Sequence, residues 1–200
     1  EYTDNRIYII NQENQGLASS LNNALALAKG EYLVRMDADD ISHPNRLEKQ
    51  LKFMESNPSI GVMGTAVNYI NEEGNILGRS FPVLKSNSIK KKILECQGNL
   101  INHPSVIIRK KTITLLGSYN PYMSFNQDYQ LWSKLLRNGV YIVNINDVLL
   151  NYRLSSNSIG SEIVFSKASK EILHKILGYD NPSEKMINEL KDSIEKSKGT

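Results

Sequence analysis

The sequence contains very little cysteine, since Cys96 is its only one among 200 residues. A single thiol cannot form an internal disulfide, so this chain is not a disulfide-stabilised scaffold. Long apolar runs are also missing. The longest ones, such as Ile7–Ile10 and Val106–Ile108, are far shorter than the roughly 18 residues of a membrane-spanning helix. An ordinary hydrophobic core must therefore hold this chain together.

An excess of charge of one sign is missing as well. The chain has 24 Lys and Arg against 21 Asp and Glu, which is too balanced to predict binding to nucleic acid. The densest basic stretch, Lys85 and Lys90–Lys92, is interpreted as a solvated helix face, with contact to an anionic membrane surface as the alternative. The length fits one domain or two small ones.

The apolar spacing predicts alternating strands and helices. In the first half it predicts strands at 7–10 and 32–36, a helix at 17–28, and a helix after Pro44 with Leu47, Leu51 and Met54 on its buried face. Further on it predicts a hairpin of 67–70 with 76–81, helices at 88–96, 110–116 and 128–138, strands at 105–109, 140–143 and 148–152, and two helices after 161. This order predicts an α/β fold with a mixed, mainly parallel sheet flanked by helices.

An acidic cluster carries the strongest chemical signal. Asp37, Asp39 and Asp40 follow directly after the apolar residues 32–36. On an extended backbone Asp37 and Asp39 point to the same side, at the end of a strand where open α/β sheets bind ligands. Crowded carboxylates repel one another without a cation, and hard divalent ions bind carboxylate and phosphate oxygens. The cluster predicts a metal site, with a solvated acidic turn before Pro44 as the alternative.

Several short motifs resemble those of family 2 glycosyltransferases of the GT-A fold. The resemblance covers roughly residues 5 to 160 and depends on the order and spacing of the motifs rather than on any one of them. They are Asn14-Gln15-Gly16-Leu17-Ala18, Ala28-Lys29-Gly30-Glu31-Tyr32, Met36-Asp37-Ala38-Asp39-Asp40, His43-Pro44-Asn45-Arg46-Leu47, Asn102-His103-Pro104-Ser105, Asp128-Tyr129-Gln130-Leu131-Trp132 and Asn151-Tyr152-Arg153.

The resemblance implies a role for each acid of the cluster. Asp37 would contact the nucleotide of the donor, and Asp39 would bind a divalent metal, Mn²⁺ or Mg²⁺. Asp40 would either assist the metal or cap the following turn. The metal would neutralise the diphosphate of a nucleotide-sugar, with a UDP-sugar as the expected donor, and so act as a Lewis acid on the leaving group.

Four further residues complete the implied site. Asp128 matches the family's catalytic base, at a helix N-terminus that favours its ionised form, with a plain helix cap as the alternative. Gln127 stands where similar proteins carry Glu, on the acceptor side together with His103. Arg153 would bind the donor diphosphate. For His103 the alternative is a structural histidine, for Arg153 a surface ion pair, and for Arg46 either the acidic cluster or the helix surface.

The implied activity is inverting, metal-dependent glycosyl transfer to a glycan, polysaccharide or lipid-linked acceptor. The alternatives are a catalytically impaired carbohydrate- or nucleotide-sugar-binding module and a metal-dependent nucleotidyltransferase. Similar proteins begin with βα units that bind the nucleotide base and that are missing here, so weak activity is expected of the isolated chain. We expect a GT-A-like domain at 1–160, a helical extension at 161–200, and a cytoplasmic protein that can associate with the inner face of the membrane.

Overall fold

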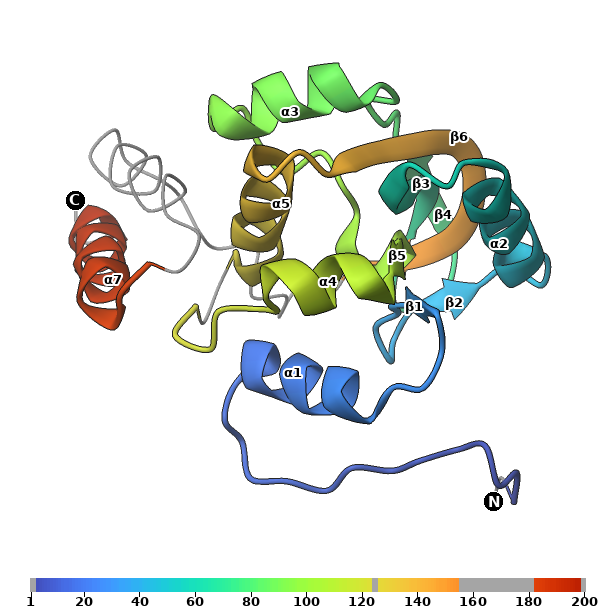
Figure 1. The fold of residues 1–200 in the computed structure, drawn as a ribbon, viewed down its shortest axis with the longest axis horizontal. Coiled ribbons are helices and arrows are strands. Elements are labelled where there is room, and N and C mark those ends of the chain that lie inside the picture. Colours follow the sequence, from blue (N-terminus) through green and yellow to red (C-terminus); the bar gives the residue numbers. More distant parts are fainter. Residues whose placement is uncertain (1–2, 124–125, 155–181, 199–200) are drawn as a thin grey trace.

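The computed structural model describes residues 3–123, 126–154 and 182–198. The elements, in chain order, are α1 (Leu17–Leu27), β1 (Tyr32–Val34), β2 (Ile41–Ser42), α2 (Arg46–Ser56), β3 (Ile60–Ile70), β4 (Ile76–Arg79), α3 (Ser86–Leu94), a 3₁₀ turn (His103–Ser105), β5 (Ile107–Arg109), α4 (Lys110–Leu116), α5 (Gln127–Arg137), β6 (Tyr141–Arg153) and α7 (Glu184–Lys198) (Figure 1). The predicted helices of the first 138 residues and the β3–β4 hairpin are thereby confirmed, and the two strands predicted at 140–152 form the single strand β6.

The sheet has the order β1-β5-β3-β6-β2, and β4 pairs with β3. It is mixed and flanked by helices, as predicted, but the expected majority of parallel pairs is wrong. Only the long pair of β3 and β6 is parallel among the described strands, and the pairs β1–β5, β3–β5, β3–β4 and β2–β6 are antiparallel.

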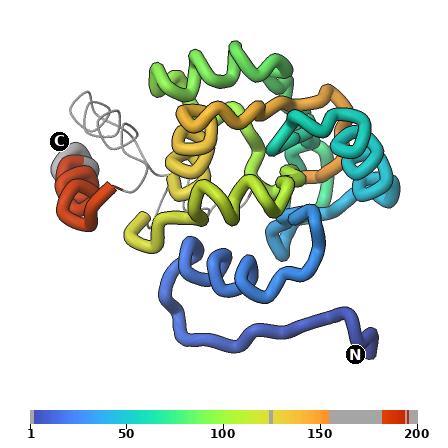
Figure 2. The backbone as a smooth tube through the Cα atoms, viewed as in Figure 1, coloured from blue at the N-terminus to red at the C-terminus, as the bar shows by residue number. Residues whose placement is uncertain are grey.

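The reason lies in the segment before α1. Residues 7–10, predicted as a strand, are not assigned to any strand, and Tyr8 and Ile9 are 72% and 82% exposed. This segment runs outside the sheet (Figure 2), and Gln12 attaches it to α1 by hydrogen bonds to Ser20 and Asn23. Because it does not pair with β1, the expected parallel strand–helix–strand unit does not form.

Alternating side chains of the central strands face two separate apolar clusters, as the pleat of a strand requires. Val62 and Ile108 face the larger cluster, which contains side chains of α1, α3, α4 and α5. Met63 and Ile107 point to the other face, where Met54 of α2 covers them. The sheet is therefore enclosed between α2 on one face and the other helices on the opposite face.

Helix α2 packs with a different face from the one predicted. Leu47 and Leu51 are 61% and 40% exposed, whereas Arg46 and Gln50 are buried together with Met54. These three residues are four apart and so lie on one helical face. Apolar spacing could not predict this face, because two of its three side chains are polar. They are buried because they bind backbone groups, as described below.

The strand directions bring several loops to one edge of the sheet. β6 is parallel to β3, and β1 runs the same way because both β1 and β3 are antiparallel to β5. The loops after β1 and β3 and the end of β6 therefore lie at one edge. The turn 103–105 precedes the oppositely directed β5, so it lies at this edge as well.

The C-terminal helix α7 packs against the same body. Leu190 is buried in the larger cluster, and Asn120 Nδ2 donates to Pro182 O over 3.0 Å. The first of the two predicted C-terminal helices and the predicted boundary at 160 lie outside the described residues. Throughout the described part, every helix is too short or too polar to traverse a bilayer.

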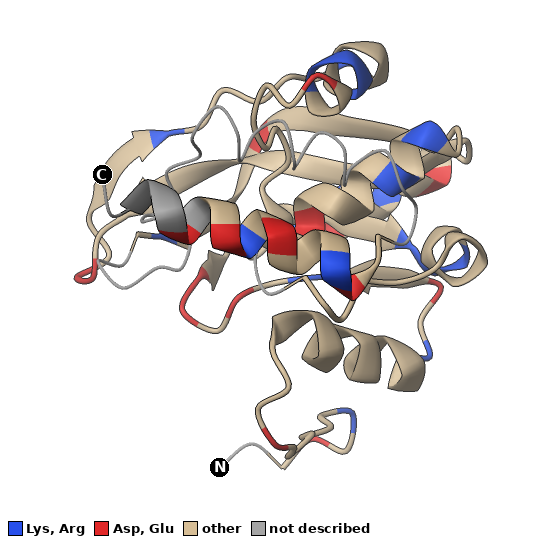
Figure 3. Ribbon diagram, turned by 90° about the vertical axis from the view of Figure 1, so that its left-hand side faces the viewer, with Lys and Arg blue, Asp and Glu red and all other residues tan. Residues whose placement is uncertain are grey.

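Charge is dispersed over the surface. Acidic and basic residues both occur along α7 and are interspersed over the rest of the ribbon (Figure 3). On α3 the side chains of Ile89 and Ile93 are buried, while Lys90, Lys91 and Lys92 are exposed. This exposure agrees with a solvated helix face, and contact with an anionic membrane surface stays the alternative.

Gly64 of β3 provides a test of the central packing. An added Cβ would overlap Oδ1 of Asn144 on β6, whose Nδ2 is held by Val83 O at 2.8 Å and Leu100 O at 3.0 Å. We expect Gly64→Ala to lower the free energy of unfolding by about 1–3 kcal/mol in urea. The control is Gly78→Ala on β4, where an added Cβ meets no atom within 4 Å. Equal stability of the two variants would contradict this account.

Candidate active site

The acidic loop lies between β1 and β2, at the edge of the sheet where the loops converge. Its residues are Arg35, Met36, Asp37, Ala38, Asp39 and Asp40. Asp40 N donates to Asp37 O over 3.4 Å, and the chain then returns to pair Ile41 with Asn151 of β6. The loop is therefore held between the end of β1 and the C-terminal part of β6, two strands that run in the same direction.

Asp37 is paired with an arginine that the sequence interpretation missed. Arg35 Nη1 donates to Asp37 Oδ2 over 2.6 Å, and Arg35 Nη2 contacts the second oxygen, Oδ1. The signal was present in the sequence, because residues two apart on an extended backbone point to the same side. The role in nucleotide binding that the resemblance implies for Asp37 remains a prediction, and the structure adds the Arg35 guanidinium as its partner.

Asp39 and Asp40 lie in different environments. The Asp39 side chain is exposed, with no hydrogen bond or ion pair to any described residue. Asp40 is 8% exposed, and its Oδ1 accepts a hydrogen bond from Arg153 N over 2.9 Å. Its Oδ2 is buried without a hydrogen-bond partner in the part of the chain that is described. Burial raises the pKa of Asp40 to about 6, and the nearby charges of Asp37 and Asp39 add to this effect.

These oxygens fit a hard divalent cation. Asp39 offers an unengaged carboxylate, and Asp40 offers a buried oxygen that lacks a donor. Across the described ranges, however, no three His, Cys, Asp or Glu side chains are already gathered as a metal site. The expected metal role of Asp39 and Asp40 is chemically consistent with the site and stays a prediction.

Arg153 ties the acidic loop to the turn after β3. Its Nε donates to Asp39 O over 2.9 Å, and its Nη1 donates to Asn71 O and Glu72 O over 2.7 and 2.6 Å. Its backbone N also binds Asp40, as described above. Arg153 is thus engaged by backbone carbonyls on two loops, and the contact with the donor diphosphate expected of it stays a prediction.

Arg46 is a buried residue that joins the start of the acidic loop to the turn 103–105. Its side chain is 1% exposed, and Nη2 donates to Arg35 O and Pro104 O over 2.8 and 2.9 Å. Its Nε donates to Gln50 Oε1 over 3.1 Å, and Gln50 Nε2 donates to Ser105 O over 2.7 Å. Burial lowers the pKa of Arg46 to about 10, so it remains charged at neutral pH. The charge of Asp40 partly offsets this lowering of the pKa, which agrees with the expected position beside the acidic cluster. The expected position on the helix surface is wrong, since Arg46 is buried and donates to backbone carbonyls and Gln50.

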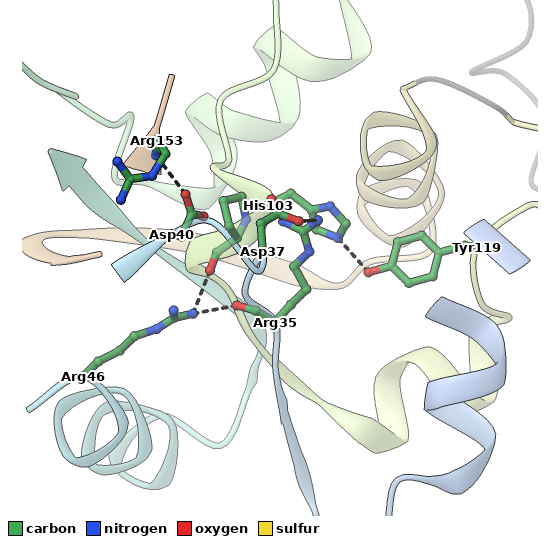
Figure 4. A network of polar contacts seen from close by, with 8 residues as sticks. Arg35, Asp37, Asp40, Arg46, His103, Tyr119 and Arg153 are labelled. Carbon is green, nitrogen blue, oxygen red and sulfur yellow. Dashed lines mark hydrogen bonds and ion pairs between the residues drawn. The ribbon is translucent and has the colours of Figure 1, made fainter. Parts of the chain in front are cut away.

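His103 lies in the interior beside this junction. Its Nε2 and the Tyr119 hydroxyl are 2.8 Å apart, and its ring meets Trp132 edge-on with 5.8 Å between centroids. Burial lowers the pKa of His103 well below its ordinary value, and the charge of Arg35 adds to this effect. The imidazole is therefore neutral. Figure 4 shows the His103–Tyr119 pair next to Arg35 and Asp37. The expected acceptor-side role of His103 remains a prediction.

Asp128 lies in the first turn of α5, as predicted. Its Oδ2 accepts a hydrogen bond from Asn99 Nδ2 over 2.6 Å, and its Oδ1 accepts one from Tyr129 N over 2.8 Å. Burial raises the pKa of Asp128, while these hydrogen bonds and the charge of Arg35 lower it. The preceding Gln127 is buried, and Asn126 before it has a left-handed backbone with φ 53°. The roles of Asp128 as base and Gln127 as an acceptor-side residue stay predictions.

Replacing Arg46 tests the junction. Arg46→Met retains much of the apolar side chain but leaves Arg35 O, Pro104 O and Gln50 without their donor. We expect a loss of about 2–4 kcal/mol in the free energy of unfolding. The control is Lys49→Met on the same helix, which removes an exposed ion pair with Asp147 and should cost under about 1 kcal/mol. Similar losses in both would show that Arg46 is not a junction.

The raised pKa of Asp40 predicts how its contribution to stability depends on pH. The folded chain holds this proton up to about pH 6, whereas the unfolded chain releases it near the ordinary value of 3.8. The carboxyl therefore becomes increasingly unfavourable to folding as the pH rises between these values, and its contribution levels off above them.

Asp40→Asn removes this titration and retains an acceptor for Arg153 N. In EDTA, the free energy of unfolding of the variant relative to the original chain should rise from about pH 4.5 to about pH 7. Urea unfolding at both pH values measures this difference. A difference that stays constant, or that moves in favour of the original chain, would contradict the raised pKa.

The geometry can be compared with proteins of related sequence. Residues 1–115 match the model of Glycosyl transferase family 2. The chain is 38% identical to the uncharacterized glycosyltransferase MJ1057 of Methanocaldococcus jannaschii over 149 residues, 74% of this chain and 50% of that protein. It is 32% identical to the amylovoran biosynthesis glycosyltransferase AmsE of Erwinia amylovora over 161 residues, 80% of this chain and 59% of that protein. The chain thus spans half to three fifths of the length of these relatives.

Two solved structures show the same fold. One is S. aureus TarS in complex with UDP, with a TM-score of 0.56 and 15% identity over 84% of this chain and 45% of that chain. The other is the mannosyltransferase PcManGT from Pyrobaculum calidifontis with GDP-Man and Mn²⁺, with a TM-score of 0.52 and 17% identity over 82% of this chain and 43% of that chain. Both have the GT-A fold, which agrees with the mixed sheet flanked by helices. From its sequence match and its fold, this chain belongs to glycosyl transferase family 2.

Proposed function

We propose that this chain carries the catalytic edge of an inverting, metal-dependent transferase that moves a sugar from a nucleotide-diphospho-sugar to a glycan, polysaccharide or lipid-linked acceptor. One observation carries the proposal. The acidic loop and the partly buried Asp128 are both within electrostatic range of Arg35, because its charge lowers the pKa of Asp40 and that of Asp128. This shared neighbour supports a site in which the acidic loop would bind the metal and Asp128 would act as the base.

The donor half of the site is the acidic loop. Asp39 and Asp40 would hold Mn²⁺ or Mg²⁺, and the metal would supply a Lewis acid for the departing diphosphate. Asp37 would accept hydrogen bonds from the ribose, since each carboxylate oxygen can accept more than one. The solved relatives, one with UDP and one with GDP-Man and Mn²⁺, support a nucleotide-diphosphate donor. We propose a UDP-sugar from the resemblance stated above.

The acceptor half of the site is the N-terminus of α5. Asp128 would take the proton of the acceptor hydroxyl as its oxygen bonds to the anomeric carbon and the bond from that carbon to the diphosphate oxygen breaks. A single displacement of this kind inverts the anomeric centre. The helix N-terminus and Asn99 favour the ionised carboxylate that the base requires. Gln127 and His103 would line the acceptor side, and Arg153 would face the diphosphate with its remaining donors.

The similarity to the amylovoran biosynthesis glycosyltransferase supports a polysaccharide acceptor, and the resemblance stated above supports a glycan or lipid-linked one. We propose that the reaction takes place in the cytoplasm and that a lipid-linked acceptor brings the enzyme to the inner face of the membrane. We assign the transfer domain to 1–160 and a helical extension to 161–200, of which α7 packs on the core.

Two substitutions separate binding from chemistry. Asp39→Asn should weaken Mn²⁺-dependent binding of UDP- and GDP-sugars by about tenfold or more in calorimetry, because a charged metal ligand is lost. Asp128→Asn should leave this binding intact and lower sugar transfer by about 10²–10⁴-fold, the usual contribution of a general base.

The control is Asp147→Asn, which removes an exposed carboxylate paired with Lys49 and should change neither quantity. Transfer that persists in Asp128→Asn would overturn the role of this base. Donor binding without transfer in the original chain, even when it is extended upstream, would favour the catalytically impaired binding module instead.

A further inference from the structure

Arg35 lies at the centre of the site, and the chemistry described above gives it no task. It follows β1 directly, and its backbone is fixed on both sides, since N donates to Val106 O over 3.2 Å and O accepts from Arg46 over 2.8 Å. Its side chain is 11% exposed. Only the guanidinium group can therefore change its position without moving the strand.

The guanidinium group of Arg35 has N–H groups that make no hydrogen bond to the described residues. Its two terminal nitrogens bind the two oxygens of Asp37, in a fork whose longer contact is 2.6 Å. Among the described residues this group makes no other hydrogen bond, so two of the five N–H groups of an arginine are used and three remain. Asp37 is 37% exposed, so its pairing with Arg35 takes place at the opening of the site.

The group lies between the two halves of the site. The charge of Arg35 acts on Asp40 and Tyr152 on the side of the acidic loop, and on His103, Tyr119 and Asp128 on the side of α5. Figure 4 shows it pointing between Asp37 and the His103–Tyr119 pair. A donor bound between the acidic loop and α5 would therefore lie beside this guanidinium.

The other two arginines of the site have partners of a different kind. Arg46 donates to backbone carbonyls and to Gln50, and Arg153 donates to the carbonyls of Asp39, Asn71 and Glu72. Arg35 is instead bound to a carboxylate. Although a phosphate group is tetrahedral and a carboxylate is planar, two oxygens of a phosphate can accept the two parallel N–H bonds of a guanidinium in the same bidentate way.

We propose that Arg35 binds the diphosphate of the donor and that Asp37 holds its guanidinium when no donor is bound. The proposal rests on the proposed function and adds a donor-binding residue to it. Donor binding then exchanges one partner of Arg35 for another, and it frees the Asp37 oxygens for the ribose. Asp37 competes with the diphosphate for Arg35, so its removal should strengthen anion binding rather than weaken it.

Calorimetric titration with inorganic pyrophosphate in EDTA tests this directly, because neither metal nor transfer is involved. Asp37→Asn should bind pyrophosphate about tenfold more tightly than the original chain, since the guanidinium is released. Asp39→Asn is the matched control, because it changes the charge of the same loop by the same amount without releasing an arginine, and it should gain less than about threefold.

Arg35→Gln should bind pyrophosphate about tenfold more weakly than the original chain. Arg35→Lys should be intermediate, because it retains the charge without the two parallel N–H groups. The double variant Arg35→Gln with Asp37→Asn should bind no more tightly than Arg35→Gln alone. Equal gains in Asp37→Asn and Asp39→Asn, or unchanged binding in Arg35→Gln, would overturn the proposal. If Arg35→Gln fails to fold by circular dichroism, the comparison of the two aspartate variants decides alone.

This test fails separately from the proposed function. A chain that binds pyrophosphate through Arg35 but never transfers a sugar would defeat the transferase and leave the anion site. A chain that transfers sugar through Asp128 while Asp37→Asn and Asp39→Asn bind pyrophosphate equally would keep the transferase and defeat the role of Arg35.

Discussion

The rest of the site depends on one buried guanidinium, that of Arg46. It joins the carbonyl of Arg35, at the start of the acidic loop, to the carbonyl of Pro104, in the turn that carries His103. A charged donor in the interior is costly unless its hydrogen bonds are made, and here backbone carbonyls and Gln50 satisfy it. The loop that starts at Arg35 and the turn that contains Pro104 are far apart in sequence, and Arg46 holds their backbones together independently of any ligand.

Sequence patterns predicted most helices because those helices obey simple rules. The stretch 110–116 is closed by Gly117, whose positive φ of 87° suits glycine. Pro44 lies just before α2. The family motifs also selected Asp37, Asp39, Asp40 and Asp128 without any coordinates. These carboxylates could therefore be identified from the order of residues alone.

The remaining features depend on which segments meet. Ile7–Ile10 has the composition of a strand, but strand formation requires a partner, and none of the described strands pairs with it. Hydrophobic periodicity did not predict the burial of Arg46 and Gln50, because it counts apolar side chains. Their burial follows from contacts with carbonyls more than 50 residues away. The pairing of Arg35 with Asp37 could have been predicted, because residues two apart on an extended backbone point to the same side.

Strand β6 has a consequence for how the two halves of the site can move. It starts shortly after α5, whose first turn carries Asp128, and it ends at Arg153, which grips the acidic loop. Its pairing with β3 extends along ten registered positions, from Ile60 with Tyr141 to Ile70 with Arg153. Helix α5, with Asp128 in its first turn, and the end of β6 that binds the acidic loop are thus parts of one continuous stretch of chain, residues 127–153. Because the register of β6 with β3 shifts at three places along this stretch, a change in the curvature of β6 would alter how α5 and the acidic loop are placed relative to each other.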